Sequence, residues 1–418
     1  MRTTFPASGI HAQDHLLLHT RYNAVAYVTD YASPQAALDA VPDGGGVVIF
    51  PAGIYLLAAS LIVRKPNTRL LSFGATLTAN HINAEILIDA SGIDDAFIDG
   101  FSMDGANLSK YAVRIANSTN STVSNCMIKN ITSVGILVGN DTEGCKIMGN
   151  KITLPVDDPF GTVINATGVQ LSSSCVDQYG GGQSDTLTFT APVSLSKNHV
   201  VEGNEVINGT HGISLYGARA CRVRSNYVNG QTHRGIILSP VASYNLVGGN
   251  ICEGFGSTGI HLAEGSSYNQ IIGNEAFTLV SNYQGNCFKA YYGCNHNVFS
   301  GNFARGSKFA AYRISMGSQY NQLSNNRAVD CETGIEIESY INANSDHYVQ
   351  GVTYQPATPP ACVGNIVDAN KLADCRTGVR LAQRGTVELN KRGIGANIFM
   401  VCQSDLAEIE ETAGKITQ

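Results

Sequence analysis

The chain has 418 residues, of which only 14% are charged, with 44 Gly, no Trp and a formal net charge of −6. The acidic balance argues against a nucleic-acid-binding protein, which usually has a basic excess, and no apolar run approaches the roughly 20 residues of a membrane span. The eleven cysteines include no CxxC pair, which favours free thiols over a disulfide framework.

Residues 1–32 are interpreted as an N-terminal arm. Their start, "MRTTFPASGIHAQDHLLLHT", lacks the apolar segment of a secretory signal. We therefore expect a cytoplasmic protein or a component of a phage or prophage tail, unless a leader has been removed from a secreted protein.

A short helix is expected near residues 33–41. Ser33 is a good N-cap and Pro34 suits the first helical position. A strand follows in "GGGVVIFPAGIYLL" (44–57), and Pro51 to Tyr55 are expected to turn the chain into a first coil.

From residue 120 onward the chain repeats itself. Between Asn204 and Asn326 similar Asn-bearing turns recur at intervals of 22, 24, 24, 28 and 24 residues. Equivalent Asn residues are expected to stack at one turn, where their amides satisfy each other and the backbone. The members of this series are Asn125, Asn150, Asn204, Asn226, Asn250, Asn274, Asn302, Asn326 and Asn365.

Between these turns lie short strands such as "GISLY" at 212 and "GIILS" at 235. They alternate apolar and polar residues with period two, and no helical pattern separates them, which excludes a doubly wound α/β fold. Two or three such strands per coil predict an all-β, single-stranded parallel β-helix over residues 33–402. Loop insertions are expected near 155–200 and 339–362, and residues 403–418 are expected to form a short helix, a tail or a cap.

The spacing, the Asn turns and above all the segment 33–63 resemble the right-handed, pectate-lyase-like β-helix superfamily, in its tailspike, rhamnogalacturonase and epimerase-like branch. The likeness covers roughly residues 40–400 and implies a right-handed solenoid with a helical cap. The chain departs from it upstream, where "YNAVAYVTDYASPQAALDAV" lacks the common Gly-Asp-Gly/Thr-Asp-Asp segment. Members include lyases, hydrolases, epimerases, transferases and inert spikes, so function has to come from the site.

The alternation predicts which side chains face outward. His261, Lys289, Arg313 and Glu336 should form one exposed column on consecutive coils about 4.8 Å apart. Tyr291 and Glu338 should lie beside it. Replacing one such exposed residue by Ala is expected to cost under about 1 kcal/mol.

This column suits β-elimination from a uronic-acid polymer, which requires a base at C5, a cation at the carboxylate and an acid for the leaving oxygen. Lys289 is predicted as the base and Arg313 as the carboxylate clamp, with Tyr291 or His261 as the acid. Glu336 and Glu338 would orient the cations or hold Ca²⁺. No metal ligand or other cofactor is assigned.

Alternatives remain open. Glu336 and Glu338, with Glu264 as a further candidate, could instead act as the carboxylate pair of a glycoside hydrolase or a transferase. A polysaccharide epimerase and a non-catalytic, tailspike-like carbohydrate-binding protein also fit. The charges could equally form ordinary cross-strand pairs, each worth about 0.2–1 kcal/mol.

The expected partner is a polysaccharide or an oligosaccharide, and a homotrimer is a possible assembly. We predict neither nucleic acid nor a membrane as a partner. Beside the column, the sequence offers candidate substrate contacts in outward positions and in the second insertion, namely Tyr216, Glu264, Tyr340, His347, Tyr348 and Arg380.

Overall fold

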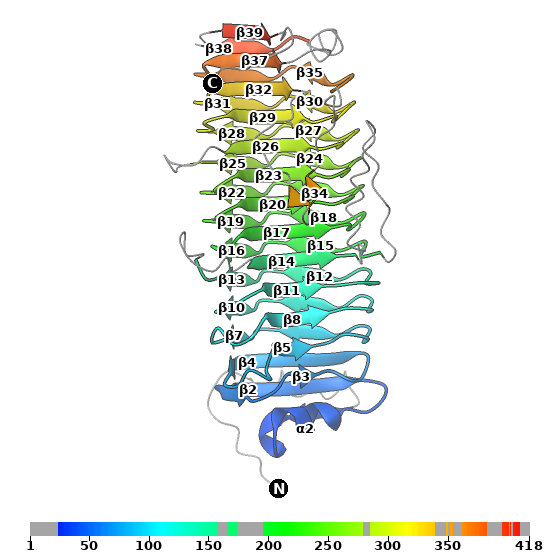
Figure 1. Ribbon diagram of the computed structural model, residues 1–418. Coiled ribbons are helices and arrows are strands. Elements are labelled where there is room, and N and C mark those ends of the chain that lie inside the picture. Colours follow the sequence, from blue (N-terminus) through cyan, green and yellow to red (C-terminus); the bar gives the residue numbers. More distant parts are fainter. Residues whose placement is uncertain are drawn as a thin grey trace, which may run out of the picture.

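The protein is a parallel β-helix whose coils stack into one elongated column (Figure 1). The computed structural model describes residues 24–156, 166–173, 195–278, 285–338, 362–382, 395–400, 402 and 404–409, and the backbone of 348–349 and 352–353. The stacked parallel strands confirm the predicted all-β solenoid. No helix in these described ranges is long and apolar enough to span a membrane.

One sheet has thirteen parallel strands, one from each coil, and we call it the thirteen-stranded sheet. Its strands, in spatial order, are β3 (Leu61–Ile62), β5 (Ile86–Asp89), β8 (Tyr111–Ile115), β11 (Val134–Val138), β14 (Thr167–Ser172), β17 (His211–Tyr216), β20 (Arg234–Leu238), β23 (Thr258–Ala263), β26 (Asn286–Tyr291), β29 (Ala310–Ser315), β32 (Thr333–Glu338), β37 (Thr377–Ala382) and β39 (Ser404–Ile409).

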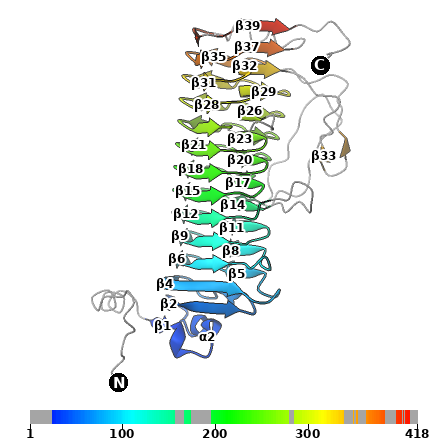
Figure 2. The ribbon, with the colours of Figure 1, turned by 90° about the vertical axis from the view of Figure 1, so that its left-hand side faces the viewer.

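The other two sides of each coil are short strands that stack into two further columns, seen beside the thirteen-stranded sheet in Figures 1 and 2. The long strands β2 (Gly46–Leu57) and β4 (Thr68–Ala79) join both columns, and β1 (Val25–Tyr27) pairs with β2. One column continues through β6 (Phe97–Asp99), β9 (Thr122–Ser124), β12 (Lys146–Met148), β15 (Val200–Glu202), β18 (Arg222–Arg224), β21 (Leu246–Gly248), β24 (Gln270–Ile272), β27 (Val298–Ser300), β30 (Gln322–Ser324) and β35 (Ile366–Asp368). The other contains β7 (Ser102–Asp104), β10 (Met127–Lys129), β13 (Lys151–Thr153), β16 (Glu205–Ile207), β19 (Tyr227–Asn229), β22 (Ile251–Glu253), β25 (Glu275–Phe277), β28 (Phe303–Arg305), β31 (Arg327–Val329), β36 (Lys371–Ala373) and β38 (Ile398–Met400).

The core is a continuous apolar column inside the coils. The inward positions predicted from the period-two alternation are buried, as in Ile236, Ile260 and Ile335. Phe288 and Tyr312 lie on neighbouring strands of this column, and their rings stack with centroids 4.9 Å apart. The buried Tyr312 hydroxyl donates to the carbonyl oxygen of Asn302 at 2.8 Å, so its polar group is satisfied.

The predicted Asn stack is present and buried. In each step the amide Nδ2 and the backbone N–H of one Asn both donate to Oδ1 of the Asn on the next coil, at 2.9–3.0 Å between Asn250 and Asn274. Nδ2 of Asn250 also donates to the carbonyl oxygen of Val223. The continuous ladder consists of Asn150, Asn204, Asn226, Asn250, Asn274, Asn302, Asn326, Asn370 and Asn397.

Two members of the predicted series were wrong. Asn125 has a left-handed φ of 53°, and its side-chain amide donates to Asp99. The hydrogen bond to Oδ1 of Asn150, the first Asn of the ladder, comes instead from the backbone N–H of Cys126. Asn365 belongs to a second buried ladder at another turn, which the sequence reasoning missed. That second ladder consists of Asn245, Asn269, Asn297, Asn321 and Asn365.

The ends and insertions are described in part. The helix α2 (Pro34–Asp39) begins at Ser33, whose Oγ accepts from Ala36 N–H, and lies at the β2 end in Figure 1. A short 3₁₀ helix, η1 (Val28–Asp30), precedes it. That α2 caps the solenoid stays a prediction. Within the first predicted insertion, β14 continues the thirteen-stranded sheet.

Within the second predicted insertion, only the backbone of the antiparallel pair β33 (Tyr348–Val349) and β34 (Val352–Thr353) is described. At the other end, within the residues expected to form a short helix, a tail or a cap, β39 continues the sheet. The ten cysteines in the described ranges are all free, as expected.

We expect Asn274→Ala to lower the free energy of unfolding by about 2–4 kcal/mol, because it leaves buried backbone and amide groups of Asn250 without an acceptor. Chemical denaturation measures the change. Glu275→Ala, at the exposed neighbouring position, serves as the control and should change stability by less than about 0.5 kcal/mol. Equal effects of the two substitutions would contradict a stabilising role of the ladder.

Candidate active site

The predicted column lies on the outer face of the thirteen-stranded sheet. His261, Lys289, Arg313, Glu336 and Arg380 are direct register partners on consecutive strands from β23 to β37. Two residues further along the strands, a second column contains Tyr291, Ser315 and Glu338. The register that the sequence predicted is confirmed.

The expected exposure of this column was wrong. His261, Glu336 and Glu338 are only 4–5% exposed, and the Arg313 side chain is 20% exposed. The long side chains lie against one another across the sheet and are held by ion pairs, so they expose little surface. An alanine substitution here therefore removes buried interactions.

Arg313 is held by two carboxylates. Its Nε lies 3.2 Å from Glu336 Oε2, and its other guanidinium nitrogen pairs with Glu338. Arg380 pairs with the remaining oxygen of Glu336 at 2.8 Å. Burial lowers the pKa of Arg313, but the two glutamates outweigh this effect and raise it. Two arginines and two glutamates thus form a network without net charge, and we call these four residues the Arg–Glu network.

Lys289 has a strongly lowered pKa and no ion pair among the described residues. Burial, assisted by Arg313 and Arg234, lowers the pKa of Lys289 to about 7, although Glu338 and Glu336 oppose the shift. Its Nζ lies 4.1 Å from the centroid of the Tyr291 ring. Near neutral pH this amine is therefore divided between its charged and neutral forms.

A basic cluster adjoins Lys289 on the preceding coils, formed by Arg234 with His211, His233 and His261. The rings of His211 and His233 stack at 5.4 Å. Burial, together with the charge of Arg234, lowers the pKa of His211 to about 3 and that of His233 to about 4, and it lowers the pKa of His261 well below its usual value. The three imidazoles are neutral at pH 7, and Arg234 carries the charge.

Arg234 was missed by the sequence reasoning, which followed only the second and fourth positions after each strand's Gly. Arg234 directly precedes Gly235 and shares a third outer column with His211, Thr258 and Asn286. Strict period-two alternation would have placed Arg234 on the inward side with Ile236 and Leu238, and it fails here because Gly235 also faces the interior, where an added Cβ would meet Cys252.

Several buried polar atoms on this face have no hydrogen-bond partner among the described residues. They include both ring nitrogens of His261, Nδ1 of His211, Oδ1 of Asn286 and Oγ of Ser315. Buried polar atoms are normally paired. Their concentration on one face marks a place where a polar ligand would supply the missing partners.

The remaining predicted contacts have different positions. Glu264 follows β23 and accepts from Ser239 Oγ at 2.6 Å, and burial raises its pKa. Tyr216 ends β17, and burial raises its pKa as well. Tyr340 and His347 lie outside the described residues, and of Tyr348 only the backbone in β33 is described.

The described residues do not fit a metal ion. They contain no group of three or more His, Cys, Asp or Glu side chains arranged to hold one. Glu336 and Glu338, the candidate Ca²⁺ ligands, are instead neutralised by arginines. No step of the chemistry is therefore assigned to a metal.

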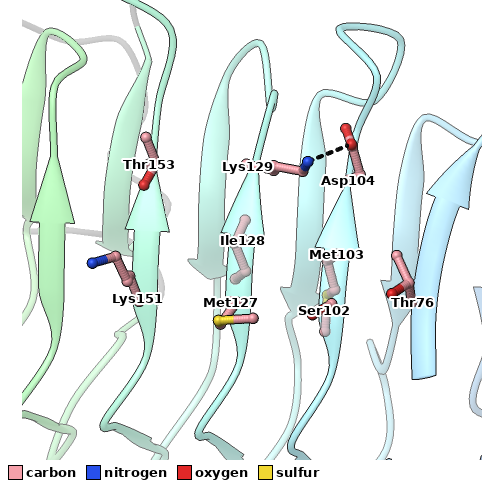
Figure 3. A pocket seen from close by; sticks show the side chains of 9 residues that line it. All are labelled: Thr76, Ser102, Met103, Asp104, Met127, Ile128, Lys129, Lys151 and Thr153. Carbon is pink, nitrogen blue, oxygen red and sulfur yellow. Dashed lines mark ion pairs between the residues drawn. The ribbon is translucent and has the colours of Figure 1, made fainter. Parts of the chain in front are cut away.

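Two open cavities that are lined by described residues lie elsewhere on the coils. One of about 390 Å³ is on the same face as the site, where Arg114, Leu137 and Gln170 continue the column of His261 toward the N-terminal coils. The other, of about 330 Å³, is on strands β4 to β13 and is shown in Figure 3. Its lysines are already paired, Lys129 with Asp104 and Lys151 with Glu205.

Comparison of the whole chain with solved structures finds proteins of similar fold. The A-module of the mannuronan C-5 epimerase AlgE4 from Azotobacter vinelandii matches with a TM-score of 0.57 at 13% identity, over 94% of this chain and 100% of that one. A PL6 alginate lyase in complex with a trisaccharide matches with a TM-score of 0.58 at 13% identity, over 94% of this chain and 89% of that one. The fold is a right-handed parallel β-helix.

Other comparisons agree at this level. An exopolygalacturonase from Thermotoga maritima matches with a TM-score of 0.53 at 12% identity, over 93% of this chain and 92% of that one. The family model described as periplasmic copper-binding protein (NosD) matches residues 190–286. A comparison with curated proteins found no match. The expected right-handed parallel β-helix is thus confirmed.

Arg313→Ala should lower the free energy of unfolding by about 3–5 kcal/mol, because it leaves Glu336 and Glu338 buried with too little compensating charge. The matched control is Arg376→Ala. Arg376 is 68% exposed and pairs with Glu332 at 2.7 Å, and loss of this surface pair should cost less than about 1 kcal/mol. Similar losses in urea unfolding of the two variants would show that the Arg–Glu network is not stabilising.

Proposed function

We propose that the protein is a polysaccharide lyase that cleaves a uronic-acid polymer by β-elimination. The observation that carries this proposal is Lys289, a partly buried amine with a pKa of about 7 on a face rich in unpaired polar atoms. A group with a pKa near the working pH is an effective general base. The lyases, epimerases and polygalacturonase among the structural neighbours support a carbohydrate as the substrate class.

In the proposed reaction the neutral Nζ of Lys289 accepts the proton on C5 of a uronate ring. The electrons of that C–H bond form the C4=C5 double bond, the C4–O bond breaks, and the leaving oxygen takes a proton. Tyr291, whose ring lies against Lys289, is the proposed acid. Lys289 then gives its proton to water and the Tyr291 phenolate takes a proton from water, so both groups return to their starting forms.

The site favours elimination over hydrolysis. Two carboxylates in a glycosidase act as acid, base or nucleophile, but both glutamates of the candidate pair are held by arginines. Epimerisation shares the removal of the C5 proton with elimination, and the product distinguishes the two. The cavity at Arg114 offers further room for a long polymer along the same face.

Incubation with alginate and polygalacturonate tests the reaction class. Elimination gives ultraviolet absorbance from the conjugated double bond together with new reducing ends. Reducing ends without that absorbance would indicate hydrolysis, altered sugar composition by nuclear magnetic resonance without cleavage would indicate epimerisation, and binding without change would indicate a binding protein. Each of these three results would contradict the proposed lyase.

We expect Lys289→Met to reduce the elimination rate by about 10² or more, since general base catalysis typically supplies 10²–10⁴-fold. The same change should raise the melting temperature, because it removes a partly buried ammonium close to Arg313 and Arg234. Lys151→Ala is the control: this lysine is 54% exposed and paired on another sheet, and its loss should leave both quantities nearly unchanged. A Lys289→Met variant with full activity would rule out this residue as the base.

The pH dependence follows from the same pKa. The neutral amine is the active form, so the rate should rise with pH and level off above about 7, and one unit below the pKa it should be about tenfold lower. The folded pKa of Lys289 lies below the unfolded value of about 10.4. Between about pH 10 and 7 the unfolded chain therefore binds a proton that the folded chain does not, and the stability of the folded protein decreases as the pH falls through this range. The gain in melting temperature from Lys289→Met should accordingly shrink as the pH approaches 10. A flat rate profile between pH 6 and 8 would contradict the assignment.

A further inference from the structure

The cavity of about 390 Å³ on the thirteen-stranded sheet has no role in the proposed chemical step. It lies over β8, β11 and β14, in the same sheet as β26 with Lys289 (Figure 1). It is lined by the direct register partners Arg114, Leu137 and Gln170. Gln170 is four strands from Lys289 in the same outer column, so at about 4.8 Å per strand the two positions are about 19 Å apart.

Arg114 is held in this cavity by a chain of hydrogen bonds. The backbone N–H and Oγ of Ser91 donate to Oδ1 of Asp89 at 3.1 and 2.6 Å. Asp89 accepts from Nη2 and Nε of Arg114 at 2.6 and 3.4 Å, which occupies one edge of the guanidinium group. Nη1 makes no hydrogen bond to any described residue, and the Arg114 side chain is 38% exposed. Arg114 therefore offers fixed N–H donors to the cavity, while Asp89 compensates its charge.

The amides that line the cavity are also available to a ligand. Gln170 is half-buried and Asn140 is exposed, and neither side chain forms a hydrogen bond within the described part of the chain. Each amide has two N–H donors and one oxygen acceptor. The half-buried Leu137 adds apolar surface between them.

Hydrogen-bond donors and acceptors around an apolar surface, without net charge, match the hydroxyl groups and C–H faces of a sugar ring. The volume of the cavity lies within the range of ligand sites, roughly 300–1,000 Å³. A phosphate group would require positive charge that Asp89 does not compensate.

We propose that this cavity is an anchoring site, which binds the hydroxyl groups of a sugar unit of the polysaccharide at a distance from Lys289. The anchoring site consists of Arg114, Leu137, Asn140 and Gln170. This inference rests on the proposed function for its class of polymer and deepens it, because it gives the protein a preference for long chains. Only a chain of several sugar units contacts both the anchoring site and Lys289, so a long substrate binds more tightly than a short one.

Filling the cavity tests the anchoring site. Calorimetry measures the binding of alginate and of polygalacturonate to the Lys289→Met protein, with and without Gln170→Trp. We expect Gln170→Trp to weaken polymer binding about tenfold, the effect of losing one or two hydrogen bonds. With Lys289 intact, Gln170→Trp should raise KM for the polymer by a similar factor and leave kcat unchanged, because only binding away from the reacting bond is lost. Cleavage of a trisaccharide should not change.

Two further variants keep the outcomes distinct. Gln270→Trp makes the same change at an exposed position of β24 in another sheet, and it should leave polymer binding unchanged. Asn140→Ala removes only an exposed amide of the anchoring site and replaces Gln170→Trp if that variant does not fold; it should weaken polymer binding severalfold.

Unchanged polymer affinity in folded Gln170→Trp and Asn140→Ala would overturn the anchoring site and leave the lyase proposal intact. A polymer that binds the native protein without elimination would contradict the lyase, whereas weaker binding to Gln170→Trp would still support the anchoring site. If the Lys289→Met protein binds neither polymer, both proposals fail.

Discussion

Buried side-chain amides hold the coils from Asn150 to Asn397 in register with one another. Within the main ladder, an Asn such as Asn274 accepts two hydrogen bonds at Oδ1 from the preceding coil and donates to both the next Asn and a carbonyl oxygen. A shift of one residue would break these bonds and would also turn every inward side chain outward. The ladders and the apolar column therefore favour the same alignment, and one consistent register follows.

That register has a direct consequence for the outer face. Residues separated by a full coil in sequence, such as Lys289 and Arg313, become neighbours because equivalent positions stack. Like charges brought together in this way are unfavourable unless acids compensate them. Glu336 and Glu338 provide that compensation for Arg313, whereas Lys289 responds by a lowered pKa. The scaffold tolerates a perturbed amine because the rest of the solenoid stabilises it.

The likeness to solved structures extends over nearly the whole chain but at 12–13% identity, which shows the fold alone. High coverage at low sequence identity is expected of a solenoid. Its inward positions only need to be apolar, and the polar groups of its turns only need hydrogen-bond partners. Outward positions are free to change, so chemistry can vary on a constant frame. Function therefore depends on the particular outer residues from β17 to β37.

The sequence by itself determined the solenoid, the inward and outward sets of residues and the column from His261 to Glu336, because strand periodicity and coil length are local properties of the chain. It misplaced Asn365 and missed the second ladder, since two turns per coil carry similar Asn signals. Only the tertiary structure decided that Arg313 is paired with two glutamates, that the pKa of Lys289 is lowered and that Arg234 lies in register with His211. Burial, pairing and pKa arise from how long side chains lie across neighbouring coils, and neither spacing nor composition contains that information.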